Sequence, residues 1–280
     1  MHYIFSELPA WLILIIIVAI SFIVTYIAFK VLRIFFSVEE LEKFKDVTGI
    51  YVSMIGVLYG VFLAFIVIAI WENYDHVKDN IDKEANALGN IYSDAAGLPP
   101  KIKYSIDSCI KKYVTLVTEK EWGYMANGKE SKEAMDARSK LQKLIVKFKP
   151  QDLGEQVIYT EMLSNLNDVT VCRRSRVNTS NAELPGILWI ILIGGGVLLI
   201  FYIACFYVEN QKFHFWLAFG VSGLIAILLF VAFELNYPFV GSDKLEPDAF
   251  QSLRSHNVEV DTTKHLIDTI TKGQMDTTKH

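Results

Sequence analysis

Apolar residues along the 280-residue chain gather into four blocks, and none of these blocks contains a charged residue or a histidine. A helix rises about 1.5 Å per residue, so roughly 20 residues span the roughly 30 Å hydrocarbon core of a bilayer. Four such helices are not credible in a soluble protein, and we therefore predict four transmembrane helices. The first two are expected at residues 11–29 and 50–71, in a membrane region that covers 8–71. The other two are expected at 187–208 and 215–233, in a membrane region that covers 187–235.

The stretch between the second and third blocks, residues 72–186, is polar and contains 17 basic and 17 acidic residues. Apolar residues recur there at helical spacing in four runs, and the first run continues the second transmembrane helix. Breaks at Gly97–Pro100, Asn127–Gly128 and Pro150 separate the runs. The predicted fold class is therefore all-α: a four-transmembrane-helix integral membrane protein with a helical-bundle insert between the second and third spans.

The remaining composition excludes several classes of protein. The tail at residues 255–280 is polar and repeats one pentapeptide, as expected of a disordered segment. A net charge of −4 provides no basic surface for nucleic acid. The six histidines lack metal-ligand spacing, and no CxxC, GxSxG or P-loop motif occurs, so we expect no enzyme, metal or cofactor. Cys109 and Cys172 could pair if the insert faces an oxidising compartment, although spacing does not establish their proximity.

The distribution of basic residues predicts the orientation. An even number of spans places both termini and the insert on one face of the membrane. The two short loops carry five basic residues in 26 positions, whereas the flanks on the other face carry six in 64. The positive-inside rule then predicts cytoplasmic short loops, with the insert and both termini outside the inner (plasma) membrane. Arg173, Arg174 and Arg176 favour the opposite orientation.

Small residues occur at helical spacing on one face of the second span, and three consecutive glycines lie in the third. Small residues let helix backbones approach closely in lipid, where packing has to hold helices together. The second-span face therefore has two interpretations, helix packing or the lining of a central path in an oligomer. For the three glycines we expect close packing or a kink. The residues are Gly49, Ser53, Gly56, Gly60 and Ala64, then Gly194, Gly195 and Gly196.

Polar and aromatic residues mark the outer end of the second span. Trp71 and Tyr74 are expected to anchor that end at the membrane interface. Glu72 lies between them and would stand at the mouth of any pore, where a ring of carboxylates would attract cations. A solvated carboxylate at the edge of the span is the alternative.

Three further polar residues are candidate sites. Glu84 interrupts the apolar stripe of the first insert helix, with Asn86 beside it, and we expect partners within the bundle or else a ligand. Glu234 follows the fourth span directly, where a carboxylate is costly unless it is paired or lies at the headgroup level. Lys244 or an arginine of the insert is its expected partner.

Several segments resemble the bestrophin-like family of bacterial membrane proteins, a family of unknown function. The resemblance covers roughly residues 8–254. It implies the architecture predicted above and, because bestrophins proper are pentameric anion channels, an oligomeric channel. The chain lacks their acidic calcium-binding run. The matching segments are Gly56–Phe65, Trp71–Tyr74, Glu84–Leu88, Leu98–Pro99, Leu184–Pro185 ahead of Trp189, Tyr237–Gly241 and Pro247–Phe250.

Two functions from different classes remain open. The first is an ion channel: a homo-oligomer in the lipid bilayer that conducts an inorganic ion, with the second span at the subunit contact or the pore. The second is a non-conducting envelope sensor or scaffold, because 115 residues of insert exceed what a connector needs. In that case the insert would bind a ligand or a partner protein.

Overall fold

The computed structural model describes residues 9–180, 184–241 and 244–255. Every regular element in these ranges is a helix. The chain forms two compact units. The membrane unit contains the residues up to His76 and Ala182–Lys244, and the insert unit contains Val77–Asn181 and the residues from Leu245 onward.

Four helices of the structure are long and apolar enough to cross a membrane. They are α2 (Ala10–Phe35), α4 (Lys45–Asp94), α9 (Gly186–Cys205) and α10 (Gln211–Asn236); the short α3 (Val38–Lys43) lies between α2 and α4. Together with the helical insert, they confirm the predicted fold class.

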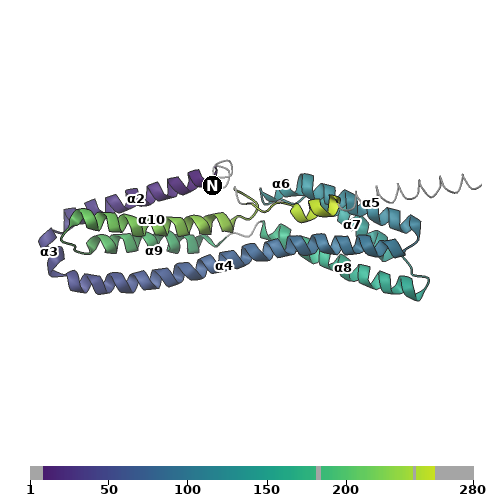
Figure 1. Ribbon diagram of the computed structural model, residues 1–280, viewed down its shortest axis with the longest axis horizontal. Helices are drawn as coiled ribbons and strands as arrows, with labels where there is room; N and C mark the ends of the chain where they lie inside the picture. The colour runs from purple at the N-terminus through teal and green to yellow at the C-terminus, as the bar shows by residue number, and fades with distance from the viewer. Residues whose placement is uncertain (1–8, 181–183, 242–243, 256–280) are drawn as a thin grey trace, which may run out of the picture. The chain divides into compact units, whose positions relative to one another are not determined.

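Helices α2, α9 and α10 lie side by side in the membrane unit (Figure 1). The hydroxyl of Ser21 donates to the carbonyl of Ser222 at 2.8 Å, and the rings of Phe22 and Phe219 are 4.5 Å apart. The part of α4 in this unit contacts α9 through Tyr59, whose hydroxyl donates to the Leu192 carbonyl at 3.1 Å. Many apolar residues on the rest of this α4 segment are exposed: Ile50, Tyr51, Met54, Val57, Leu58, Val61, Phe65 and Ile68.

The helices do not end where the apolar blocks end. Helix α2 continues through Lys30 and Arg33, because apolarity records membrane depth and charged residues continue a helix readily. The Arg33 guanidinium donates to the Gln211 side chain at 2.8 Å. Helix α10 begins at Gln211 because the Asn210 side chain accepts the Phe213 N–H and caps it. The start of α10 therefore follows its cap rather than the edge of the apolar block.

The insert unit consists of the second part of α4 and the helices that follow it. Its core is apolar, and Leu88, Ile106, Ile110, Leu141 and Ile145 are almost fully buried. The helices are η1 (Ala95–Gly97), α5 (Pro100–Leu116), the π-helix η2 (Val117–Glu121), α6 (Trp122–Met125), α7 (Lys132–Lys147) and α8 (Leu153–Thr179).

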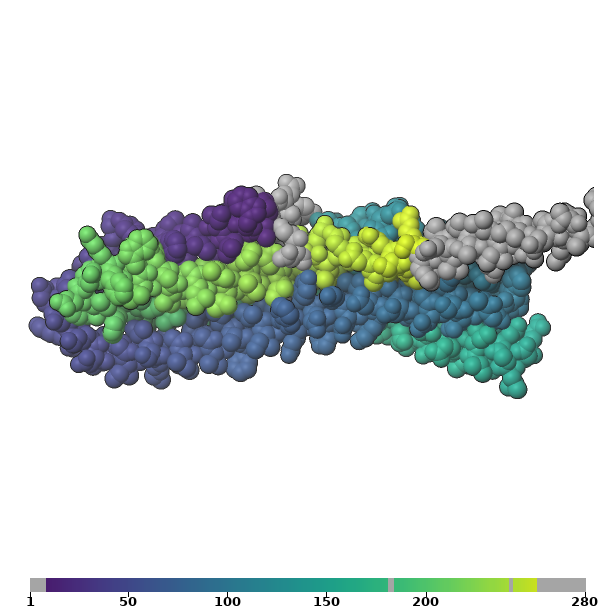
Figure 2. Space-filling view, viewed as in Figure 1, coloured from purple at the N-terminus to yellow at the C-terminus, as the bar shows by residue number. Residues whose placement is uncertain are grey.

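A C-terminal segment completes the insert unit, and the sequence did not predict this. Residues 248–255 are helical, and Phe250 is fully buried with its ring edge-on to Trp122 at 6.0 Å. The Trp122 indole N–H donates to the Leu245 carbonyl at 2.8 Å. Figure 2 shows this segment, in yellow, lying along the insert helices. Apart from residue 255, the predicted disordered tail lies outside the described residues.

Candidate functional site

Four charged side chains meet inside the insert unit. We call them the charge cluster: Glu84, Glu121, Arg173 and Arg176. Both Glu84 and Arg176 are fully buried. The Arg176 guanidinium donates to both oxygens of Glu84, at 2.9 and 3.1 Å, and to Oε1 of Glu121 at 3.0 Å. Arg173 donates to Oε2 of Glu121 at 2.6 Å. Two positive and two negative charges therefore balance.

Each member of the charge cluster comes from a different helix, except for the arginines. Arg173 and Arg176 lie three residues apart on α8 and so share one face of that helix. Glu84 comes from α4, and Glu121 is the last residue of the π-helix η2. The charge cluster therefore joins three helical segments that are distant in the sequence.

Aromatic and sulfur groups enclose the Arg176 guanidinium. Its central carbon lies 5.3 Å from the Trp122 ring centroid and 5.6 Å from that of Phe250, within the range of cation–π contacts. One guanidinium nitrogen is 3.0 Å from the Met125 sulfur. The C-terminal segment thus covers a charge supplied by α8.

Tyr113 on α5 is the neutral member of the arrangement. Its hydroxyl donates to Glu84 Oε1 at 2.5 Å. Burial, together with the charge of Glu84, holds the pKa of Tyr113 well above its usual value, so the hydroxyl remains a donor. Burial alone would lower the pKa of Arg176, but the carboxylates, Glu84 foremost, outweigh it and the net shift is upward. The guanidinium therefore stays charged.

The chemistry of the charge cluster favours fixed helix pairing. The arginines cannot give up a proton at physiological pH, and their partners are held in ion pairs. Among the described residues, no group of three or more histidines, cysteines and acids could hold a metal ion. Cys109 and Cys172 are buried free thiols. The arrangement offers charge compensation and directional hydrogen bonds.

Part of the small-residue face of the second span packs against other residues of the chain, and part does not. A Cβ added at Gly49 would lie 3.1 Å from the Phe206 ring, and one at Gly56 would contact Leu199 at 3.9 Å. A Cβ at Gly60 would meet nothing within 4 Å. Ser53 and Ala64 are exposed. Part of this face is therefore packed within the protomer, and the part around Gly60 is not.

The residues predicted at the outer end of the second span differ in how exposed their side chains are. Trp71 and Glu72 are exposed, and Tyr74 is half-buried. Asn86 is exposed and does not join Glu84, contrary to the expectation of a shared polar site. Residues i and i+2 of a helix lie about 200° apart around the helix axis. Because Glu84 faces the core, Asn86 faces away from it.

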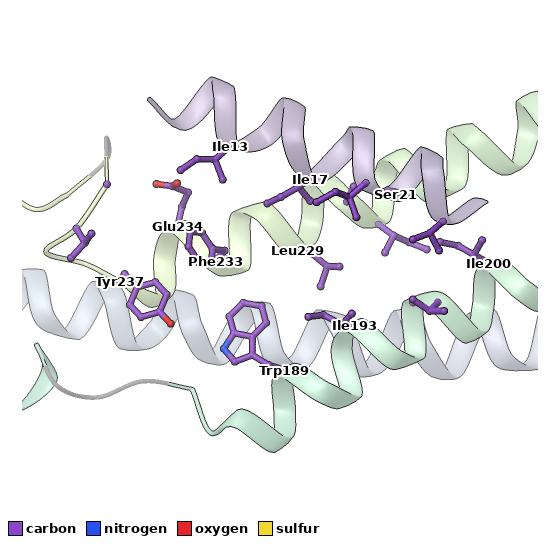
Figure 3. A pocket seen from close by; sticks show the side chains of 18 residues that line it. Ile13, Ile17, Ser21, Trp189, Ile193, Ile200, Leu229, Phe233, Glu234 and Tyr237 are labelled. Carbon is purple, nitrogen blue, oxygen red and sulfur yellow. The ribbon is translucent and has the colours of Figure 1, made fainter. Parts of the chain in front are cut away.

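Glu234 lies in the membrane unit, beside an apolar cavity of about 640 Å³ between α2, α9 and α10. Figure 3 shows Glu234 next to Ile13 at one end of the cavity, with Tyr237 and Trp189 across from them. The backbone of Gly241 passes close to the carboxylate: a Cβ there would be 3.0 Å from a Glu234 oxygen, and the φ of +94° also favours glycine.

Sequence reasoning singled out Glu84, but not its hydrogen-bond partners Tyr113 and Arg176. It also missed Glu121, the second carboxylate that Arg176 binds. The signal available was the position of the arginines. Arg173 and Arg176 lie among Val169, Cys172 and Val177, which are all buried on α8. A charged residue within an apolar stripe indicates a buried partner of opposite charge. It does not identify which carboxylate among 17 in the insert provides it.

Comparisons with known proteins agree with this architecture. A family profile described as the Bestrophin-like domain matches residues 11–250. The fold is similar to that of a bacterial bestrophin homologue from Klebsiella pneumoniae with a single substitution, with a TM-score of 0.67, 12% identity, and coverage of 88% of this chain and 99% of that chain. Another crystal structure of that homologue gives 0.62 at 12% identity, covering 88% and 97%. No curated protein matches the sequence.

Proposed function

Because the chain belongs to the Bestrophin-like family, we propose that it is an oligomeric ion channel in which α4 forms the subunit contact or the pore lining. The observation that carries this proposal is the surroundings of Gly60 and Ala64. Both lie on the membrane-spanning part of α4, and neither is covered within the protomer. The apolar positions around them on α4 are also largely exposed.

A surface of this kind suits a second copy of the chain. Lipid offers no hydrophobic drive between helices, so association depends on close packing, which small residues permit. Bare backbone at Gly60 with the Ser53 hydroxyl on the same face would also suit a narrow ion path. Repeated around an axis, the exposed Glu72 would place a ring of carboxylates at the mouth. The conducted species in this proposal is an inorganic ion.

We further infer that the short loops are cytoplasmic and that the insert and both termini lie outside the plasma membrane. The density of basic residues supports this, with five in 26 loop positions against six in 64 on the other face. Insertion precedes folding, so Arg173 and Arg176 count in that comparison although both are buried in the folded insert unit.

The deciding experiment is the mass of the full chain in lipid nanodiscs, combined with ion flux into liposomes. We expect a closed ring with flux above that of empty vesicles. Gly60→Leu should dissociate the ring or lower the flux, because the side chain enters the proposed contact or path. Gly194→Leu is the matched control, since a Cβ there also meets nothing within 4 Å. A monomer whose flux equals that of empty vesicles would contradict the proposal.

A second candidate function is an envelope sensor or scaffold whose insert binds a partner protein. The observation that favours it is a set of exposed apolar residues on α8: Leu153 is 85% exposed, Val157 70% and Val171 56%. Photo-crosslinkers at Leu153 and Val157 should then capture a specific partner in cells. The same crosslinkers forming bonds only between copies of this chain would favour the oligomer instead.

A further inference from the structure

The membrane unit contains a cavity that the proposed channel function does not use. It has a volume of about 640 Å³ and lies between α2, α9 and α10 (Figure 3). This is within the range of roughly 300–1,000 Å³ that small hydrophobic ligands occupy in proteins. We propose that an acyl chain of a membrane lipid occupies this cavity.

The lining of the cavity is almost entirely hydrocarbon. Ile17 projects into it from α2, Ile193 and Ile200 from α9, and Leu229 from α10. Ser21 is the hydroxyl-bearing residue of the wall formed by α2, and its hydroxyl already donates to the Ser222 carbonyl. The middle of the cavity therefore presents methyl and methylene groups to its contents.

The size and the lining together select the occupant. The cavity is open to the surroundings of the helices, because its lining residues Ile20, Ile193 and Val197 are 54%, 53% and 44% exposed. Water needs two to four polar partners, and the isoleucine and leucine walls do not supply them. Hydrocarbon fills the space without that cost.

The location of the cavity identifies the source of that hydrocarbon. All three of its helices are long and apolar enough to cross a membrane, so acyl chains surround them. Glu234, close to the C-terminal end of α10, lies at one end of the cavity beside Ile13. A carboxylate in a span is least costly at the headgroup level, so that end is where a lipid chain would enter.

The test uses the full chain in phosphatidylcholine nanodiscs that contain a trace of phosphatidylcholine with a diazirine midway along one acyl chain. After irradiation, peptide mapping should locate label at Ile17, Ile200 and Leu229, which line the cavity and are buried or half-buried. Labelling there should exceed that at Ile27 and Ile190, which are exposed and outside the cavity lining. Label confined to the outward residues would overturn the proposal.

A pair of variants distinguishes the cavity from the general lipid annulus. Leu229→Trp fills the space and should reduce label at Ile17 and Ile200 to the level of Ile190. Ile190→Trp adds the same indole on the exposed face of α9 and should leave cavity labelling unchanged. Circular dichroism and gel filtration show whether both variants fold, and unreduced cavity labelling in a folded Leu229→Trp variant would count against the site.

Protein could instead fill the cavity, and this is measured directly. A photoreactive amino acid placed at Ile200, which lines the cavity and is 5% exposed, would then bond to residues 1–8 of the same chain or to a neighbouring copy. Either product as the main adduct overturns the lipid assignment, and a lipid adduct supports it. Both results are independent of ion flux, so they do not depend on the channel proposal.

Discussion

Arg176 is a fully buried charge, and its environment explains how the insert unit tolerates it. Removing a charge from water costs several kcal/mol after relaxation, which an ion pair repays only with good geometry and satisfied donors. Here Nε and Nη2 donate to carboxylates and Nη1 reaches a sulfur, while two aromatic rings lie within cation–π distance. A buried ion-pair cluster gains little net stability over an apolar core, so we expect its main effect to be on which helices pair.

Replacing Arg176 alone should therefore be strongly destabilising. Arg176→Met leaves Glu84 and Glu121 buried without their shared partner, and removing one member of a buried pair costs about 3–5 kcal/mol. We expect a much lower midpoint of thermal unfolding for the purified variant in detergent, with unfolding monitored by tryptophan fluorescence. Arg254→Ala is the control: its ion pair with Glu119 is exposed, and the midpoint should hardly change.

The hydroxyl of Tyr113 should make stability depend on alkaline pH. Burial raises the pKa of Tyr113 in the folded protein, so above about pH 10 the unfolded chain loses this proton first and folding weakens. Tyr113→Phe removes that loss, although at pH 7 it costs about 1–3 kcal/mol because Glu84 loses a donor. The gap in thermal midpoint between wild type and variant should narrow as the pH rises through 10. Tyr104→Phe, at a 72% exposed position, should show no gap at any pH.

At the scale of helices, the three glycines of α9 have different roles. A Cβ at Gly195 would lie 2.8 Å from the Tyr59 ring, whereas one at Gly194 would meet nothing within 4 Å. Gly195→Ala should push Tyr59 away from the Leu192 carbonyl, weaken the contact between α4 and α9, and cost about 1–3 kcal/mol. Gly194→Ala should instead raise the thermal midpoint, since alanine favours a helix by about 1 kcal/mol. Equal shifts in the two variants would contradict this assignment.

The limits of sequence reasoning are also clearest for these helices. Spans and insert helices are predictable because hydrophobic periodicity is a local property. The run Gly194–Gly196 likewise predicts close packing or a kink from the sequence alone. Which of those glycines contacts a neighbour depends on the rotation of α9, which is set by packing. Glu84 and Arg176 are 92 residues apart in the sequence, so local spacing carries no information about their pairing. The Phe250 contact with Trp122 was missed for the same reason.

At the scale of the whole molecule, the family assignment and the charge distribution bear on different properties. Membership of the Bestrophin-like family concerns the fold, and the fold is unchanged if the chain is inverted across the membrane. Orientation follows from basic residues near the spans at the time of insertion. The helical region of bestrophins proper is cytosolic, so the resemblance would predict a cytosolic insert. The basic residues of the short loops predict instead that the insert lies outside. A single measurement of sidedness therefore separates the two arguments.

We predict that a membrane-impermeant maleimide added to intact cells labels Lys129→Cys but not Glu39→Cys. Lys129 is exposed in the loop between α6 and α7, and Glu39 is exposed on α3 between the first two spans. Both substitutions belong in a Cys205→Ala background, because Cys109 and Cys172 are buried. Lysed cells provide the control, in which both positions should react. Labelling of Glu39→Cys alone in intact cells would place the insert in the cytoplasm. The orientation would then be that of the bestrophins. It would contradict the positive-inside rule, because the short loops that carry Lys30, Arg33 and Lys43 would lie outside.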